Sequence, residues 1–196
     1  MKVGIIGLGQ LGENISRRLI SNKVEVYGYR RNYQKASDTY DNKYLTGVNT
    51  TIEYLVKSVK ESWLYGEKSG DTFVQRSPGI FQLAVPKESI DEVIDELLQF
   101  CSEGDIIINY CNCDANVSRK WAEQLPKVGV QYIDVGIAGG ISGLDHGYGL
   151  VVTGGKYAVD TCRTIFDAIS MGYRPSNTKN DYVNYPQDYG WIHRDW

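Results

Sequence analysis

The sequence predicts an α/β domain built on a doubly wound parallel sheet, and three observations support this prediction. Short apolar segments recur along the chain, and segments with apolar residues at helical spacing separate them. A glycine-rich turn joins the first apolar segment to the first helical one. The 196 residues suffice for one such domain and are too few for two. This alternation is typical of parallel sheets that helices cover on both faces.

The opening of the chain predicts a strand–helix–strand unit. Residues 2–6 form a short apolar run that ends in glycine, as buried parallel strands do. Residues 10–21 place Leu11, Ile15 and Leu19 on one helical face, and residues 24–29 predict a second strand.

The later elements continue the same order. We expect further strands at residues 80–85, 105–109, 130–135 and 149–153, and helices at 89–100, 114–125 and 156–169. Pro86 ends the first of these strands because it cannot extend a hydrogen-bonded ladder, and Asp114 is expected to cap the helix that follows it. Two segments break the alternation. We interpret residues from about 57 to 77 as a surface insertion with room for one short helix, and residues 173–196 as an irregular tail after a domain of residues 1–172.

The composition argues against several classes of partner. A net charge of −3 gives no basic surface for nucleic acid or an anionic membrane. No apolar stretch is long enough to span a bilayer, and the N-terminus lacks the pattern of a signal peptide. We therefore expect a cytoplasmic protein with no nucleic-acid or membrane partner.

The four cysteines do not form the pattern of a disulfide framework. Cys111 and Cys113 make a C-x-C pair that could in principle hold a metal. The two histidines, His146 and His193, lie far from this pair, so no tetrahedral ligand set is complete. We favour reduced, partly buried thiols and expect no metal.

A G-x-G-x-x-G motif occupies the first turn, and its members are Gly7, Leu8, Gly9, Gln10, Leu11 and Gly12. Between a strand and a helix this motif is the dinucleotide-binding turn of the Rossmann fold. The first glycine permits the tight turn, the second lets the backbone approach a pyrophosphate, and the third allows close packing of the helix. The helix N-terminus would then present free N–H groups to the phosphates. The alternative is that the glycines serve the turn alone.

The residues after the second strand predict which cofactor binds. NAD-preferring domains place a carboxylate there to bind the ribose 2′-hydroxyl, whereas this chain has Arg30, Arg31 and Asn32. Adjacent guanidinium groups can hold a 2′-phosphate by charge-assisted hydrogen bonds. The sequence therefore predicts NADP over NAD, and the alternative is that the arginines are solvated surface charges.

Several motifs in one order resemble the N-terminal coenzyme-binding domain of 6-phosphogluconate dehydrogenase. The opening MKVGIIGLGQLGENISRRLI looks like the first unit of that family, and LAVP at residues 83–86 is similar to its fourth-strand motif. DIIINYCNC at residues 105–113 stands where the family has an acidic Gly-Gly-Asn-Ser stretch. YIDVGIAGGISGLDHGYGLVVTGG at residues 132–155 follows a family segment built on VG-x-SGG, GY and GG. The resemblance extends from residue 1 to about 170.

The resemblance implies NADP-dependent oxidative decarboxylation of 6-phosphogluconate to ribulose 5-phosphate, in gluconate utilisation and the pentose phosphate pathway. It places Asn112 beside the nicotinamide and the substrate, a small phosphorylated sugar acid. Cofactor-cleft residues would be Ala84, Val85 and Pro86, and the substrate-facing loop would contain Ala138, Gly139 and Gly140.

Departures from the family limit this assignment. Ala138 replaces a serine, which should weaken substrate binding by about 1 kcal/mol. Cys113 replaces a second serine, and Tyr110 and Cys111 replace two glycines. The catalytic lysine of the family lies on a later helix, and no segment here matches it. Asn112 is therefore the one weak candidate for a catalytic role, since a loop histidine such as His146 is more often simply exposed.

Two hypotheses from different classes follow. The chain is the cofactor half of a 6-phosphogluconate dehydrogenase-type enzyme, without the all-helical catalytic domain, and is completed by that domain or as a homodimer. Alternatively, it is a non-catalytic NADP-binding module or truncated relic. A different β-hydroxyacid dehydrogenase is a weaker third hypothesis.

Overall fold

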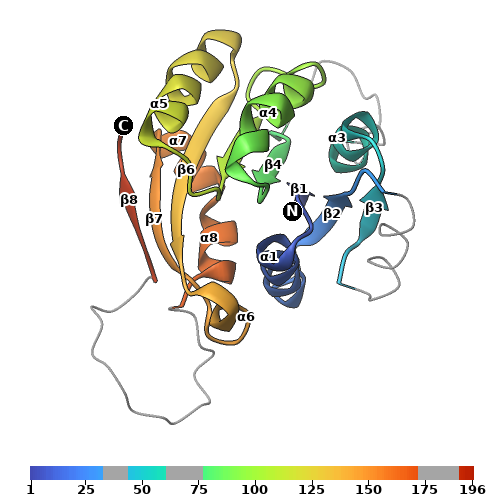
Figure 1. Ribbon diagram of the computed structural model, residues 1–196, viewed down its shortest axis with the longest axis vertical. Coiled ribbons are helices and arrows are strands. Elements are labelled where there is room, and N and C mark those ends of the chain that lie inside the picture. The colour runs from blue at the N-terminus through green and yellow to red at the C-terminus, as the bar shows by residue number, and fades with distance from the viewer. Residues whose placement is uncertain (33–43, 61–76, 172–189) are drawn as a thin grey trace, which may run out of the picture.

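The computed structural model describes residues 1–32, 44–60, 77–171 and 190–196. Within these residues the strands form one eight-stranded sheet in the order β3-β2-β1-β4-β5-β6-β7-β8 (Figure 1). The strands are β1 (Lys2–Ile6), β2 (Glu25–Tyr29), β3 (Gly47–Asn49), β4 (Ile80–Leu83), β5 (Ile106–Asn109), β6 (Gln131–Ala138), β7 (Gly149–Gly154) and β8 (Trp191–Arg194). The six strands from β3 to β6 in the sheet all pair in parallel. The predicted doubly wound sheet is therefore confirmed.

One pairing departs from a purely parallel sheet. β7 runs antiparallel to β6, with Ile133 opposite Gly154 and Ala138 opposite Gly149. The connection between the two strands holds only a 3-10 helix, Gly140–Ser142, and the four-residue helix α6 (Gly143–His146). A connection this short cannot cross the sheet to start a parallel neighbour.

The prediction of an irregular tail at residues 173–196 is wrong for the last residues of the chain. Trp191–Arg194 form β8, which pairs in parallel with β7. Trp191 is buried, packs 5.4 Å from the Phe166 ring and donates from Nε1 to Asp167 at 2.8 Å. Four residues are too few to show a hydrophobic period in the sequence. The strand forms because the edge of β7 offers backbone partners to these residues. Residues 173–189 of that tail lie outside the described residues.

Helices cover both faces of the sheet. They are α1 (Gln10–Ser21), α3 (Ile52–Lys60), α4 (Ile90–Leu98), α5 (Ala115–Gln124), α7 (Lys156–Thr161) and α8 (Arg163–Ile169). Apolar residues of α1, α7 and α8 form one core with the strands, and those of α3, α4 and α5 form a second core on the opposite face. Each fully buried aliphatic side chain stabilises the fold by about 1.5–3 kcal/mol, so both faces contribute to stability.

The predicted helices are confirmed with two differences. The helix expected at residues 156–169 is broken at Cys162, whose backbone leaves helical geometry at φ −92° and ψ 4°. No glycine or proline marks this break, so the sequence carried no signal for it. The expected insertion overlaps the end of α3 at Lys57–Lys60, and residues 61–76 lie outside the described residues. As predicted, Asp114 caps α5 by accepting from the Asn116 N–H at 2.8 Å.

Candidate dinucleotide and ligand site

The sheet order places the candidate site between β1 and β4. From β1 the chain builds outward to β2 and β3, then crosses back to β4 and builds in the other direction. Ligands of open α/β sheets bind at the carboxyl ends of the strands where this reversal occurs. The glycine turn follows β1 and Ala84–Pro86 follow β4, so the two segments meet at that edge; the Ala84 N–H donates to Ile6 at 2.8 Å.

The three glycines of the turn have different surroundings. Gly7 has a positive φ of 97°, and a Cβ there would lie 2.4 Å from the Ala84 carbonyl oxygen. A Cβ on Gly12 would lie 1.9 Å from the Gly7 carbonyl oxygen. A Cβ on Gly9 would meet nothing within 4 Å. Packing therefore explains two of the glycines, while Gly9 leaves the backbone open to the approach of a phosphate.

The N-terminus of α1 is suited to an anion. Its N-cap, Gly9, makes no side-chain capping bond. The free N–H groups and the helix dipole therefore give this end partial positive charge. Glu13 is an acidic residue in the first turn, but its carboxylate accepts from Arg30 at 3.2 Å and from the Tyr44 hydroxyl at 2.8 Å. The helix end and these residues fit a dinucleotide phosphate.

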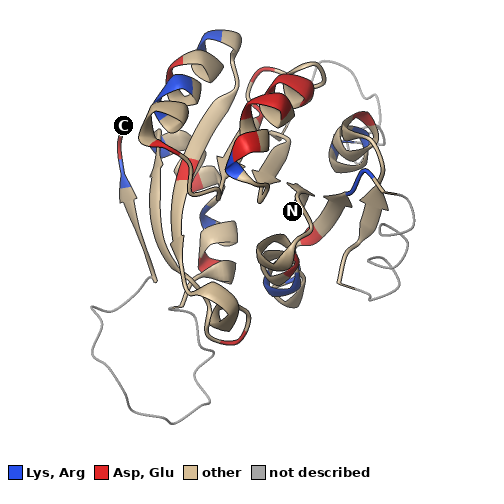
Figure 2. Cartoon of the chain, in the orientation of Figure 1, with Lys and Arg blue, Asp and Glu red and all other residues tan. Residues whose placement is uncertain are grey.

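The two arginines after β2 have different environments. Arg30 also donates to the Leu8 carbonyl, so its partly buried guanidinium stabilises the backbone of the glycine turn. Arg31 is exposed and pairs with Glu92 on α4 at 3.0 Å. This carboxylate raises the pKa of the Arg31 guanidinium. Figure 2 shows that α4, the helix that carries Glu92, is rich in acidic residues. Asn32 is exposed beside them.

The loop after β5 carries Asn112 on a buried polar network. Asn109 Nδ2 donates to Asp134 at 2.9 Å and to the Tyr132 hydroxyl at 3.1 Å, while its Oδ1 accepts from the Cys111 N–H at 3.0 Å. Burial raises the pKa of Asp134, and the hydrogen bond from Asn109 opposes that rise. The network fixes the backbone on which Asn112 stands exposed.

The Cys111 thiol joins this loop to the segment after β4. It donates to the Val85 carbonyl at 2.9 Å, and burial raises its pKa to about 12. A thiol with this pKa stays protonated at neutral pH and is therefore a poor nucleophile. All four cysteines are free, and no group of three or more metal-binding side chains occurs among the described residues.

A cavity of about 280 Å³ brings several predicted residues together. Its lining residues are Gln10, Leu11, Asn14, Asn112, Ile137, Gly140, Ile141 and Tyr148. Four of them had been assigned from the sequence, two to the glycine turn and two to the substrate region. The cavity therefore joins the cofactor turn to the expected substrate loop.

Not every predicted residue lines this cavity. Ala138 and Gly139 are exposed next to it, and Gly139 lies against the Tyr148 ring, where a Cβ would come within 3.0 Å of Cδ1. The pairs Val85–Pro86 and Arg30–Arg31 line neither this cavity nor the smaller one described below. His146 is exposed on α6 and does not line the cavity.

The sequence analysis missed Asn14, Ile137, Ile141 and Tyr148. Asn14 lies one helical turn beyond Gln10, so helical geometry could have placed it on the same side of α1. Tyr148 belongs to the GYG segment at residues 147–149, but its closeness to α1 depends on how the loop after β6 folds back.

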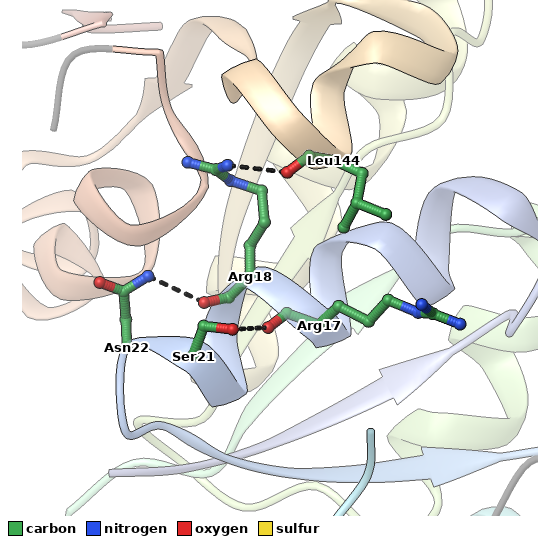
Figure 3. A pocket seen from close by; sticks show the side chains of 5 residues that line it. All are labelled: Arg17, Arg18, Ser21, Asn22 and Leu144. Atoms are coloured by element: carbon green, nitrogen blue, oxygen red, sulfur yellow. Dashed lines mark hydrogen bonds between the residues drawn. The ribbon is translucent and has the colours of Figure 1, made fainter. Parts of the chain in front are cut away.

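A second cavity, of about 140 Å³, lies at the other end of α1 (Figure 3). Its polar groups are used within the protein: the Arg18 guanidinium donates to the carbonyls of Leu144 at 3.0 Å and Ser170 at 3.1 Å. Ser21 and Asn22 donate to carbonyls of the last turn of α1. Burial lowers the pKa of the Arg18 guanidinium, although Tyr148 opposes this. Most polar groups that line this cavity are therefore already hydrogen-bonded to backbone carbonyls, and the cavity is a gap at the end of α1.

The amino-acid sequence of the chain is similar to those of known dehydrogenases. The model of the family described as the NAD binding domain of 6-phosphogluconate dehydrogenase matches residues 2–180. The chain is 30% identical over 175 residues to the Bacillus subtilis (strain 168) protein named "Putative 6-phosphogluconate dehydrogenase YqeC", covering 88% of this chain and 53% of that protein. It is 26% identical over 170 residues to "6-phosphogluconate dehydrogenase, decarboxylating" of Drosophila melanogaster, covering 85% of this chain and 32% of that enzyme. The chain thus spans about half and about a third of the length of these relatives.

Solved structures share the fold. A Plasmodium falciparum 6-phosphogluconate dehydrogenase, solved with NADP+ and with 6-phosphogluconate, superposes with a TM-score of 0.70 at 25% identity, over 87% of this chain and 34% of that one. A Mycobacterium tuberculosis 3-hydroxyisobutyrate dehydrogenase has the same TM-score of 0.70 at 14% identity, over 99% of this chain and 54% of that one.

No helix among the described residues is long and apolar enough to cross a membrane.

Proposed function

The chain belongs to the family of NAD-binding domains of 6-phosphogluconate dehydrogenases, and we propose that it is the NADP-binding half of such an oxidoreductase. The observation that carries the proposal is the continuity of the glycine turn with the cavity. Gln10 and Leu11 belong to the turn and also line the cavity that contains Asn112 and Gly140. A dinucleotide whose phosphates lie on the turn would extend its other end into that cavity.

The residues of the chain would bind and orient the ligands. Gly9 and the start of α1 would hold the pyrophosphate by backbone N–H groups. Asn112, on the fixed loop after β5, would hydrogen-bond a ligand in the cavity, and Ile137 and Ile141 would exclude water from one side of it. The cofactor, when bound, supplies the acceptor for a hydride.

We propose that NADP is preferred and that Arg31 provides the preference. Its guanidinium lies after β2, where the ribose 2′-substituent of a dinucleotide is recognised, and its present partner is an exposed carboxylate that a phosphate dianion can replace. Arg30 is held by Glu13 and the Leu8 carbonyl, so it would support the turn and contribute to binding of both cofactors.

The full reaction is part of the same proposal. The named relatives suggest oxidative decarboxylation of a phosphorylated sugar acid, 6-phosphogluconate, in gluconate utilisation and the pentose phosphate pathway. Such a protein would work in the cytoplasm, with a helical domain or a second copy completing the site. The catalytic base would come from outside the cavity lining, because none of its eight residues is a His, Lys, Asp, Glu or Cys.

That same observation favours a second candidate function, a non-catalytic NADP-binding module. An assay of NADPH formation from NADP+ and 6-phosphogluconate, run beside titrations with NADPH and NADH, separates the two. Turnover by the chain supports the enzyme, and binding without turnover supports the module. Absence of binding to either nucleotide contradicts both.

The cofactor preference has its own test. We expect Arg31→Ala to weaken NADPH binding at least tenfold and to leave NADH binding nearly unchanged, because a charge-assisted contact to a phosphate contributes about 1.5–3 kcal/mol. Glu92→Gln, which releases the same guanidinium, is the matched variant and should not weaken NADPH binding. Equal affinity of the parent chain for both nucleotides would overturn the NADP assignment and leave the dinucleotide site intact.

A further inference from the structure

We propose that Tyr148 and Asn14 form a neutral hydrogen-bonding floor of the cavity, which holds a hydroxyl or carboxamide group of the bound ligand. The inference rests on the proposed function and gives a role to two residues that the sequence analysis did not assign to the site. It also states the class of ligand group that this part of the cavity takes.

The hydroxyl of Tyr148 is the first observation. Tyr148 is 1% exposed and lines the cavity, and within the described residues its buried hydroxyl has no hydrogen-bond partner. Arg18 interacts with it electrostatically, but the Arg18 guanidinium donates to the carbonyls of Leu144 and Ser170 instead. Buried polar groups nearly always have a partner, so an unpaired phenol at a cavity points to a ligand or to solvent that a ligand displaces.

The backbone of Tyr148 is hydrogen-bonded on both sides, and its ring packs closely. The Tyr148 N–H donates to Ile169 at 2.9 Å, and its carbonyl accepts from the Met171 N–H at 2.9 Å. A Cβ on Gly143 would lie 1.9 Å from Cε1 of the ring, so the ring lies directly on this glycine. The phenol cannot move to another partner without moving α6. Its hydroxyl is held in place before any ligand binds.

Asn14 is the second observation. It is 8% exposed on α1 and lines the same cavity, and within the described part of the chain its amide makes no hydrogen bond. An amide and a phenol each donate and accept, so together they match a group that also does both. Hydroxyls and carboxamides have this property.

The side chains that line the cavity carry no charge. None of the eight lining residues is Lys, Arg, His, Asp or Glu. A carboxylate or phosphate buried here would lose its hydration without a counter-charge, which is strongly unfavourable. The side chains of Tyr148 and Asn14 therefore suit a neutral group, whereas the N-terminus of α1 at Gln10 suits an anionic one.

Two sources could supply this neutral group, the nicotinamide end of the cofactor and a hydroxyl of the sugar acid. Tyr148→Phe removes only the hydroxyl and keeps the ring on Gly143. We expect it to weaken binding of the affected ligand about three- to tenfold, the effect of one hydrogen bond. Because it also removes an unpaired polar atom, the melting temperature should stay the same or rise.

Tyr110→Phe is the matched control. Tyr110 is also 1% exposed, but its hydroxyl donates to Gln82 at 2.9 Å outside the cavity. This variant should lower the melting temperature and leave ligand binding unchanged. Opposite responses of the two tyrosines would separate a ligand contact from a structural role. Asn14→Ala provides a second variant, with weaker binding of the same ligand expected.

The probes are NADPH, adenosine 2′,5′-bisphosphate, which lacks the nicotinamide end, and 6-phosphogluconate added to the NADP+ complex. Loss confined to NADPH identifies the cofactor as the source, and loss confined to 6-phosphogluconate identifies the sugar acid. Equal weakening of NADPH and the bisphosphate overturns the inference, as does unchanged binding of every probe that the parent chain binds. If the parent chain binds no nicotinamide nucleotide, the proposed function itself fails.

Discussion

The turn after β1 and the loop after β6 are both rich in glycine, but their glycines serve different purposes. In the first turn, Gly7 and Gly12 face backbone atoms at distances that no side chain could share. In the second loop, Gly140 has a positive φ of 51° with nothing within 4 Å of a Cβ, and Gly143 faces an aromatic ring. The first turn is closed by the contact of Gly12 with Gly7 and by the contact of Gly7 with Ala84 after β4. The second packs against Tyr148, whose hydroxyl has no hydrogen-bond partner within residues 1–32, 44–60, 77–171 and 190–196.

The largest effect is expected from Gly12→Ala in the closed turn. The new Cβ would lie 1.9 Å from the Gly7 carbonyl oxygen, and backbone cannot give way as a side chain can. We expect a loss of about 3 kcal/mol in the free energy of unfolding and loss of NADPH binding. Urea unfolding and nucleotide titration measure the two effects.

Gly9→Ala is the control for that prediction. Its Cβ has open space, so stability should change by less than about 0.5 kcal/mol, while NADPH binding weakens because the methyl group occupies the phosphate approach. Near-parental stability of Gly12→Ala would show that the turn is not closed as the structure describes it.

A smaller effect is expected from Gly143→Ala in the open loop. The Cβ would lie 1.9 Å from Cε1 of Tyr148, and because a side chain and a short helix can shift, we expect a cost of about 1–2 kcal/mol. Binding should weaken at least as much as in Tyr148→Phe, since the whole ring is displaced. Thermal unfolding with NADPH titration tests both.

Two variants make this prediction specific to the ring. Gly136→Ala in β6, where the nearest atom would be 3.7 Å away, should be close to neutral. In a Tyr148→Ala background the Gly143 substitution should cost much less, and full additivity of the two changes would argue against the ring contact.

The smallest effect concerns a carboxylate beneath the second loop. Burial raises the pKa of Asp134, so the folded state disfavours its charged form. The penalty applies above the raised pKa and vanishes below the ordinary value of 3.8. We expect Asp134→Asn to be slightly more stable than the parent at neutral pH, and this gain to disappear as the pH falls through that window. The difference in unfolding free energy between the two proteins, measured against pH, checks the sign; a gain that persists at low pH would contradict it.

The sequence analysis predicted the parts of the fold that depend on local patterns. β1, the glycine turn and α1 form where expected, and Asp114 caps α5 as its position indicated. It did not predict the break at Cys162 or the strand at Trp191–Arg194, because neither has a local signal. Gln10, Leu11, Asn112 and Gly140 line one cavity. The sequence could not show that the adjacent residues Arg30 and Arg31 have different partners and different exposure.

By itself, the sequence determined the fold class, the family and the dinucleotide turn. These depend on hydrophobic periodicity and on the spacing of the glycines between the first strand and the first helix. Only the tertiary structure decided which arginine is exposed, where the last strand pairs and what forms the floor of the cavity. Tyr148 and Asn14 are 134 positions apart in the sequence and come together because the loop after β6 folds onto α1. An unpaired hydroxyl is a property of that packing, and no pattern of residues along the chain records it.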